Sequence, residues 1–312
     1  MDAASIDQVR LNFNPQSLFA LNAVIGLMML GVALDLKVSD FKRIWVAPKG
    51  PAIGLGAQFI LLPAFTYLLT LILNVRPSMA LGMMLVAACP GGNLSNVMTY
   101  LARGNAAMSV SMTACSTAAA IFMTPFNLAL WGSLNPSTAP ILHRVSLNPI
   151  DVFNTIFVIL GIPLIVGMTI SRIFPNLAGK IRRPFRIISL MVFMAVVGMA
   201  LAANWQNFLT YVGMVMFAVF VHNAMALALG YWSARLTHLN MRDSRAVSIE
   251  VGIQNSALGL ILVFNFFGGL GGMAIVAAWW GVWHIISGLT LAIYWSRRPL
   301  PGDPELAVSM DA

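Results

Sequence analysis

Long apolar stretches follow one another along almost the whole chain, with short polar gaps between them. A helix that crosses a bilayer needs about 20 predominantly apolar residues. Nine ranges meet this need: 15–36, 50–73, 78–102, 105–133, 150–171, 185–203, 207–234, 244–267 and 272–296. Alternation typical of membrane strands is not sustained, and a helix satisfies its own backbone hydrogen bonds in lipid. The pattern predicts an all-α polytopic membrane protein with nine transmembrane helices.

The composition agrees with this pattern. Hydrophobic residues make up 59% of the 312 residues and charged residues only 9%, whereas soluble domains contain about 25% charged residues. Cys89 and Cys115 both lie inside apolar ranges without a CxxC pair, which argues against a disulfide framework or a zinc site. The net charge of +8 is carried by loops, so membrane topology explains it better than binding to nucleic acid does.

The positions of the lysines and arginines predict the orientation of the chain. With nine spans, fifteen of the eighteen basic residues fall on one side, and only Arg10, Arg76 and Arg144 fall on the other. Cytoplasmic loops carry the excess of basic residues, so we expect the N-terminus outside and the C-terminus in the cytoplasm. Residues 1–14 would then form an extracytoplasmic lead-in and residues 297–312 a cytoplasmic tail.

Two of the predicted spans contain polar, helix-breaking interruptions. The third span is divided by "CPGGNLSN" and the eighth by "EVGIQNS". Pro90 lacks a backbone donor, and Gly91 and Gly92 allow non-helical backbone, so the helix should unwind there. Two such interruptions in spans that run in opposite senses are typical of inverted-repeat transporters, with two crossed discontinuous helices. Kinked helices packed by small residues are the simpler alternative.

Glu250 is the only acid well inside a predicted span. No lysine or arginine lies at comparable depth, so its carboxylate needs a proton or a bound cation. Oxygen ligands are available because Ser109 and Thr113 share one face of the fourth span. Hydroxyls of this kind more often bond carbonyls of their own helix. His222 and His284 also lie within spans, and a packed histidine is the preferred interpretation for His222.

The stretches "CPGGNLSNVMTYLARGN", "EVGIQNS", "VHNA" and "VWHIISG" together resemble the bile acid:sodium symporter family, in its bacterial branch. The resemblance covers nearly the whole chain. It implies alternating access between a core domain and a panel domain, without the first helix of the ten-helix version. The transmembrane region 15–296 would divide into a core, 50–133 and 207–296, and a panel, 15–36 and 150–203.

The resemblance also implies two sodium sites that share Glu250. The residues of the first site would be Ser95, Asn96, Ser109, Thr113 and Glu250. Those of the second would be Gln58, Glu250, Gln254 and, through their backbone carbonyls, Val251 and Ile253. Asn255 and His284 are candidate substrate contacts, together with Asn93, where relatives often have threonine. Because Asn93 would lie near the substrate site, this difference from the relatives affects the expected identity of the substrate and not that of the coupling ion.

A protein of this family would use two Na⁺ ions to import a small organic anion, such as a bile acid, a steroid conjugate or pantoate. We expect a monomer in the lipid bilayer of the inner (plasma) membrane. One alternative keeps the fold and uses Glu250 as a proton site, in a proton-coupled carrier or a sodium/proton antiporter. Another is an intramembrane enzyme with Cys89 or Ser95 beside His284, but no HExxH or GxSxG pattern supports it.

Overall fold

The computed structural model describes residues 6–8, 10, 15–145, 148–182, 184–185, 187–188, 191, 205–298 and 300. The predicted sixth span, 185–203, lies almost entirely outside the described residues, as do most of the lead-in and of the tail. In the described part, helices occupy the other eight predicted ranges, and no β-strand is present. The all-helical fold class is confirmed, while the count of nine spans stays a prediction.

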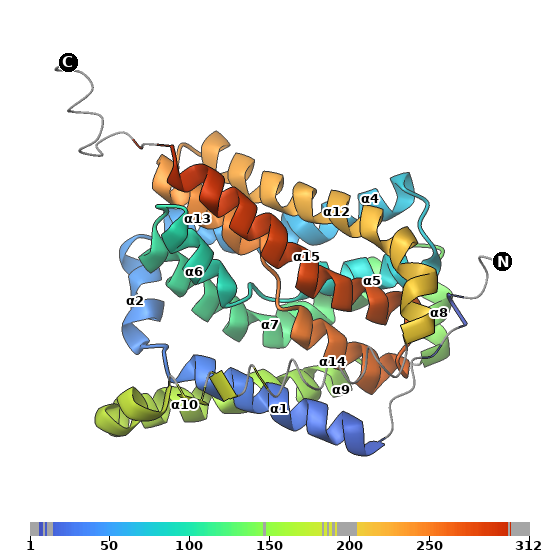
Figure 1. Cartoon of the computed structure of the whole chain (residues 1–312), viewed down its shortest axis with the longest axis horizontal. Coiled ribbons are helices and arrows are strands. Elements are labelled where there is room, and N and C mark those ends of the chain that lie inside the picture. The colour runs from blue at the N-terminus through green and yellow to red at the C-terminus, as the bar shows by residue number, and fades with distance from the viewer. Residues whose placement is uncertain are drawn as a thin grey trace.

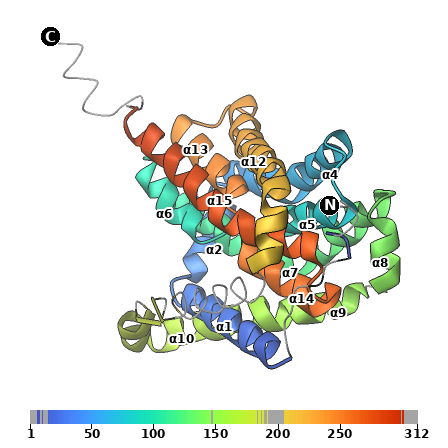
Figure 2. The same cartoon turned by 45° about the vertical axis from the view of Figure 1, so that its right-hand side comes forward.

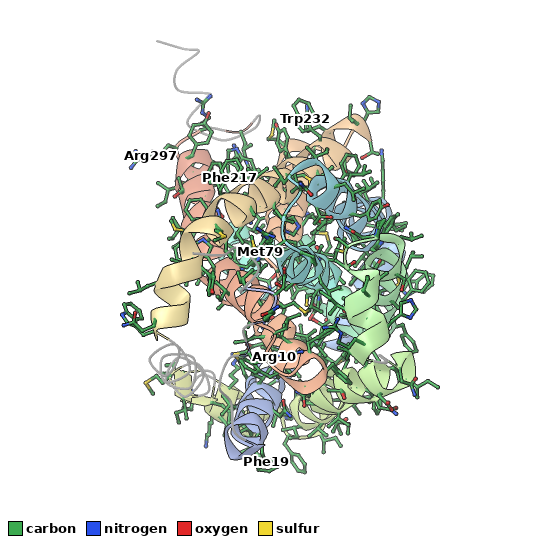
Figure 3. The ribbon with its side chains drawn as sticks, turned by 90° about the vertical axis from the view of Figure 1, so that its right-hand side faces the viewer. Arg10, Phe19, Met79, Phe217, Trp232 and Arg297 are labelled. Carbon is green, nitrogen blue, oxygen red and sulfur yellow. The ribbon has the colours of Figure 1, made fainter. Side chains whose placement is uncertain are left out.

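Five described helical segments are long and apolar enough to cross a membrane. They are Lys49–Ile72, Ala106–Leu134 (α7), Ile150–Ile173, Tyr211–Leu236 and Gly271–Ser296. Three shorter apolar helices accompany them: Asn22–Ala33, Pro77–Ala88 and Ser256–Phe267. Phe217 and Trp232 lie on the periphery, with 63% and 59% of their surface exposed, whereas Met79 is buried in the interior (Figure 3). Large apolar side chains that face outward fit a lipid environment.

The helices form two groups that pack side by side. The first contains α1 (Pro15–Ala33) and the continuous segment of α9 (Pro149–Ile156), η3 (Phe157–Gly161) and α10 (Ile162–Ile173). This group lies along one face of the remaining helices (Figures 1 and 2). Buried side chains of Leu36, Leu164 and Ala114, the last on α7, pack together where the groups meet. The assignment of the groups to a panel and a core stays a prediction.

Two helices of the larger group are broken at the predicted interruptions. The third range contains α5 (Pro77–Ala88) and α6 (Leu94–Leu101), and the eighth contains α13 (Met241–Gly252) and α14 (Ser256–Phe267). The two unwound segments cross and bond each other. The Gly92 N–H donates to the Ile253 carbonyl at 2.6 Å, and the Asn255 N–H donates to the Pro90 carbonyl at 2.9 Å. Backbone groups freed from the helices therefore satisfy each other inside the protein.

The glycines in the first break allow the two breaks to approach each other closely. The chain is non-helical at Gly91 and Gly92, as predicted, but among the described glycines only Gly268 and Gly269 have positive φ. A Cβ on Gly91 would overlap the Glu250 carboxylate, and one on Gly92 would lie 3.1 Å from the Gln254 carbonyl oxygen. The missing side chains let the two breaks meet.

A π-helical turn, η2 (Ala57–Leu61), lies between α3 (Lys49–Gly56) and α4 (Leu62–Ile72). Pro63 follows it and has no N–H to donate back to the preceding turn. The Phe59 carbonyl in that turn instead accepts a hydrogen bond from Asn127 Nδ2 at 3.0 Å. Gln58 lies within the π turn, and such turns occur frequently at functional sites.

The described part of the N-terminal lead-in docks on the start of α5 and the end of α14. Ile6 is completely buried, and the Asp7 carboxylate accepts from the Ser78 N–H at 2.8 Å in the first turn of α5. Arg10 donates to the Phe267 carbonyl at the end of α14. The lead-in therefore satisfies the termini of two helices that the sequence alone did not connect to it.

Candidate functional site

Glu250 lies in the last turn of α13 with 1% of its surface exposed. Its carboxylate accepts hydrogen bonds from hydroxyl groups on two other helices. Ser95 Oγ of α6 donates at 2.6 Å, and Thr113 Oγ1 of α7 lies 2.9 and 3.0 Å from the two carboxylate oxygens. Ser109 Oγ, one turn before Thr113, lies at 3.3 Å. None of the basic residues in the described part of the chain forms an ion pair with Glu250.

Asn96 completes this cluster. Its Oδ1 lies 2.9 Å from Ser109 Oγ and 3.2 Å from Thr113 Oγ1, so both hydroxyls can donate to it. The structure thus brings together all five residues predicted for the first sodium site. Their hydroxyls carry three protons, and these protons are shared among both Glu250 oxygens, Asn96 Oδ1 and the Ser109 carbonyl. The carboxylate therefore lies among neutral hydroxyl and amide groups, and the cluster carries one negative charge when Glu250 is ionised.

The residues predicted for the second site surround the crossing of the two breaks. Gln58 Nε2 donates to the Cys89 carbonyl at 2.8 Å and to Gln254 Oε1 at 2.7 Å. Gln254 Nε2 in turn donates to the Val251 carbonyl at 2.7 Å. Gln58 Oε1 is buried and has no hydrogen-bond partner among the described residues. An unsatisfied buried acceptor is costly, and a cation at this position would satisfy it.

The three candidate substrate contacts are less closely associated. Asn255 caps the N-terminus of α14 through a bond from the Leu258 N–H, and its Nδ2 lies 3.8 Å from Met29 Sδ of α1. Asn93 is half-buried at the start of α6. His284 is buried in α15 (Gly271–Ser296), and no hydrogen bond in the described part of the chain joins it to the two asparagines. No hydrogen bond in the described part of the chain joins any two of these three residues, so their common role stays a prediction.

His222 of α12 (Trp205–Leu236) has a packing role. Its Nε2 lies 2.7 Å from Thr66 Oγ1, and its ring makes an edge contact with Trp280 at 4.7 Å between centroids. The next residue, Asn223, donates from Nδ2 to the Gly252 carbonyl at 2.8 Å. Sequence reasoning missed Asn223, although it stands beside His222 as a second polar residue in an apolar span.

Arg245 is the other residue that sequence reasoning missed. It was counted only among the basic residues of the cytoplasmic side, at the start of the eighth span, but just 3% of its surface is exposed. Its guanidinium donates to the carbonyls of Ala102, Trp295 and Arg298 at 2.7, 3.0 and 3.2 Å. These carbonyls lie at the C-terminal ends of α6 and α15, where a positive charge is favourable.

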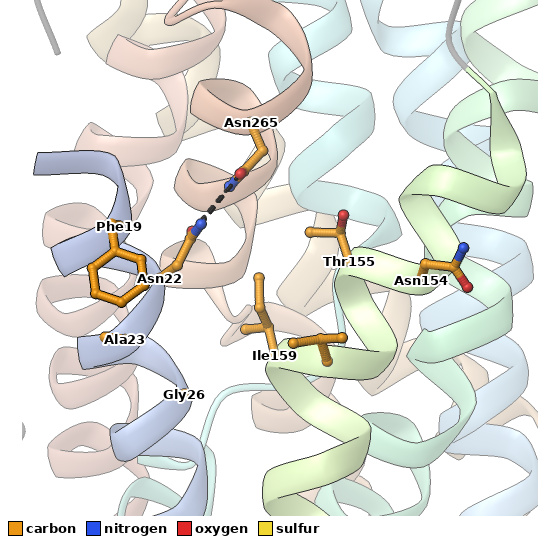
Figure 4. Close-up of a pocket in the computed structure, with 9 residues that line it drawn as sticks. Phe19, Asn22, Ala23, Gly26, Asn154, Thr155, Ile159 and Asn265 are labelled. Atoms are coloured by element: carbon orange, nitrogen blue, oxygen red, sulfur yellow. Dashed lines mark hydrogen bonds between the residues drawn. The ribbon is translucent and has the colours of Figure 1, made fainter. Parts of the chain in front are cut away.

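A cavity of about 530 Å³ lies between α1, the α9–η3 segment and α14. Figure 4 shows its lining, in which the amides of Asn22 and Asn265 face each other across the two groups of helices. Each Nδ2 donates to the other Oδ1, at 3.2 and 2.9 Å. This amide pair links α1 directly to the second half of a broken helix.

A comparison with known protein families decides the class of this protein. The model of the sodium bile acid symporter family matches residues 23–211, which is more than half of the chain. The chain belongs to this family. The family resemblance of the sequence is thereby confirmed, and sodium-dependent transport agrees with a carboxylate surrounded by hydroxyl and amide oxygens.

Several curated relatives cover most of the chain. The uncharacterized sodium-dependent transporter YocS of Bacillus subtilis (strain 168) is 32% identical over 293 residues, which are 92% of this chain and 88% of the relative. The probable chloroplastic sodium/metabolite cotransporter BASS1 of Oryza sativa subsp. japonica is 33% identical over 89% of this chain and 66% of its own length. The sodium-dependent organic anion transporter of Mus musculus is 30% identical over 82% of this chain and 72% of its own length.

The family and these relatives are transporters and not enzymes. The intramembrane enzyme is therefore set aside as an alternative for this family member. Sodium dependence is common to the relatives, and the apolar helices imply a protein embedded in a lipid bilayer.

Proposed function

We propose that this family member is a sodium-coupled symporter that imports an organic anion by alternating access, with two Na⁺ ions that share Glu250. One observation carries the proposal: the buried Glu250 carboxylate is surrounded by neutral hydroxyl and amide groups and has no basic partner in the described chain. A cation would balance the charge of this carboxylate. Na⁺ is the cation on which the relatives depend.

The chemistry of the first site supports a hard cation. Every candidate ligand is a hydroxyl, amide or carboxylate oxygen, the donor type that hard cations select. The described residues contain no group of three or more His, Cys, Asp or Glu side chains that would hold a metal. A single carboxylate with neutral oxygens suits a monovalent ion better than a transition metal. In this proposal Ser95, Asn96, Ser109, Thr113 and Glu250 bind the first sodium ion.

The second site would draw on the free acceptor of Gln58. Gln58 Oε1 is buried beside the crossing, and Gln254 and the carbonyls of Val251 and Ile253 supply further oxygens. Gln254 Nε2 now donates to the Val251 carbonyl, so ion binding would turn this amide and free that carbonyl. Sodium would in this way order the two breaks against each other.

The proposed substrate follows from charge. Two sodium ions on one carboxylate leave a local charge of about +1, which attracts an anion strongly in a medium of low dielectric constant. The helices α6 and α14 begin at the breaks, and their positive N-terminal dipoles add to this attraction. Asn93, Asn255 and His284 are the proposed contacts. A relative named as a sodium-dependent organic anion transporter supports the same substrate class.

For the transport cycle, we place the protein in the inner (plasma) membrane as a monomer, with the N-terminus outside. The two groups of helices would act as core and panel and would move relative to each other. The cavity beside the Asn22–Asn265 pair lies between the groups (Figure 4). Rearrangement at this boundary would open and close access to the anion.

Uptake into vesicles tests the proposal, with NaCl or KCl buffer at fixed pH and a panel of labelled organic anions. Sodium should stimulate uptake of at least one anion, and Glu250→Ala should abolish the stimulation. Asp151→Asn is the matched control because Asp151 is an exposed acid at the start of α9, and it should leave uptake unchanged. Accumulation by the Glu250→Ala protein, or uptake that follows a pH gradient in potassium buffer, would refute sodium coupling through this residue.

A further inference from the structure

Asn223 binds the last carbonyl of α13, directly beside the segment proposed to supply backbone ligands. It is completely buried, and its Nδ2 donates to the Gly252 oxygen at 2.8 Å. Its Oδ1 accepts from Ser287 Oγ of α15 at 2.5 Å. Gly252 permits this approach because a Cβ there would overlap the Leu227 side chain of α12. Three helices thus meet at the amide of Asn223.

This contact determines where the neighbouring carbonyl points. Ile253 has extended backbone angles, φ −109° and ψ 95°, and successive groups along extended backbone point to opposite sides. The Gly252 oxygen faces α12, and the Ile253 oxygen faces the crossing, where it accepts from the Gly92 N–H at 2.6 Å. Without Asn223, the peptide between Gly252 and Ile253 would be held only through its N–H, which donates to the Ile249 carbonyl at 2.9 Å, and the direction of the Ile253 oxygen would be less firmly fixed.

The other broken helix has a matching contact. Gln58 Nε2 donates to the Cys89 carbonyl at 2.8 Å, at the end of α5. In both cases an amide from a neighbouring continuous helix binds the carbonyl at the start of a break. The two amides differ at their oxygens, because Ser287 bonds Asn223 Oδ1 whereas Gln58 Oε1 has no partner. Gln58 therefore has an oxygen available for an ion, and Asn223 does not.

We propose that Asn223, held in place by Ser287, is a positioning residue for the second sodium site. It does not bind the ion. It fixes the direction of the Ile253 carbonyl and so determines the sodium affinity of that site. This inference rests on the proposed function, since it assumes that Na⁺ binds at the crossing. His222 supports the arrangement because its contacts with Thr66 and Trp280 hold α12 against α4 and α15.

The test is sodium-dependent thermal unfolding of the purified full-length protein in detergent. NaCl is titrated against KCl at constant total salt, and the readout is the sodium concentration that gives half of the maximal stabilisation. Asn223→Ala should raise this concentration about tenfold, the change expected when one well-placed hydrogen bond is lost. Ser287→Ala should raise it about threefold, since Asn223 keeps its own donor and loses only its support.

Asn135→Ala is the matched control. Asn135 is also a buried asparagine and donates from Nδ2 to Thr70 Oγ1 at 3.2 Å, but it lies at the C-terminal end of α7, away from the crossing. Its loss should lower the unfolding temperature and leave the half-saturating sodium concentration unchanged. This separates a positioning role from a general loss of stability.

Four results would contradict the positioning role of Asn223 or the proposed function. Unchanged sodium dependence in Asn223→Ala overturns the inference, and so does an equal shift in Asn135→Ala. If Asn223→Ala does not fold, Ser287→Ala carries the test, and an unchanged half-saturating concentration in that variant overturns the inference. If the unaltered protein shows no stabilisation by sodium over potassium, the proposed function itself fails.

Discussion

Gly91→Ala places one methyl group against the Glu250 carboxylate and should disable the first sodium site. The added Cβ would lie 2.8 Å from the Glu250 carboxyl carbon and would overlap one of its oxygens. Because Gly91 does not have positive φ, alanine can adopt its backbone angles without strain. The effect should therefore act through Glu250. Displacement would break the bonds from Ser95 and Thr113 at 2.6 and 2.9 Å.

The magnitude follows from these bonds. Hydrogen bonds to a charged group contribute about 1.5–3 kcal/mol each, so loss of two removes at least about 3 kcal/mol. If that energy holds the carboxylate in its binding position, the sodium concentration for half-maximal uptake should rise at least about 100-fold.

Sodium titrations of uptake measure this value. Gly259→Ala is the control, because a Cβ at Gly259 has only ordinary contacts, the nearest with Cys89 Sγ at 3.7 Å. It should retain the sodium dependence of the unaltered protein. A Gly91→Ala protein with an unaltered half-saturating sodium concentration would refute the close approach between the break and Glu250.

Two further predictions concern stability, measured by thermal unfolding in detergent. Arg245→Lys should cost about 1–2 kcal/mol, because lysine cannot reproduce the three carbonyl bonds of the guanidinium; an unchanged unfolding temperature would contradict this. Asn127→Ala should cost about 1–3 kcal/mol by leaving the Phe59 carbonyl without its donor. Adding Pro63→Ala should recover part of that loss, since alanine supplies a backbone N–H; a double variant no more stable than Asn127→Ala would argue against this explanation.

Much of the candidate site was predictable because its residues stand out against an apolar background. Glu250 is an acid in a span without a basic partner, and Ser109 and Thr113 share a helix face. The structure brings these residues together with Ser95 and Asn96. The alternative interpretation, that these hydroxyls bond carbonyls of their own helix, was also partly right. Thr113 Oγ1 faces Glu250 and also lies 3.0 Å from the Ser109 carbonyl oxygen.

Asn223 and Arg245 were not predictable in the same way. A buried asparagine and an arginine near a span end have ordinary explanations in a sequence, as a packed polar residue and a topology signal. Their roles depend on which carbonyls of other helices come within reach. Asn223 meets the Gly252 carbonyl 29 positions along the chain, and Arg245 meets Ala102 143 positions away.

The sequence by itself determined the membrane environment, the helical class and the two interruptions, because apolar length, proline and glycine act on their own stretch of chain. It also identified the one intramembrane carboxylate. Only the tertiary structure decided that Gly91 is needed for contact with Glu250, that the lead-in docks on α5 and α14, and that Asn223 holds the second break. These features depend on distances between helices far apart in the chain, and such distances are set by packing and not by local pattern.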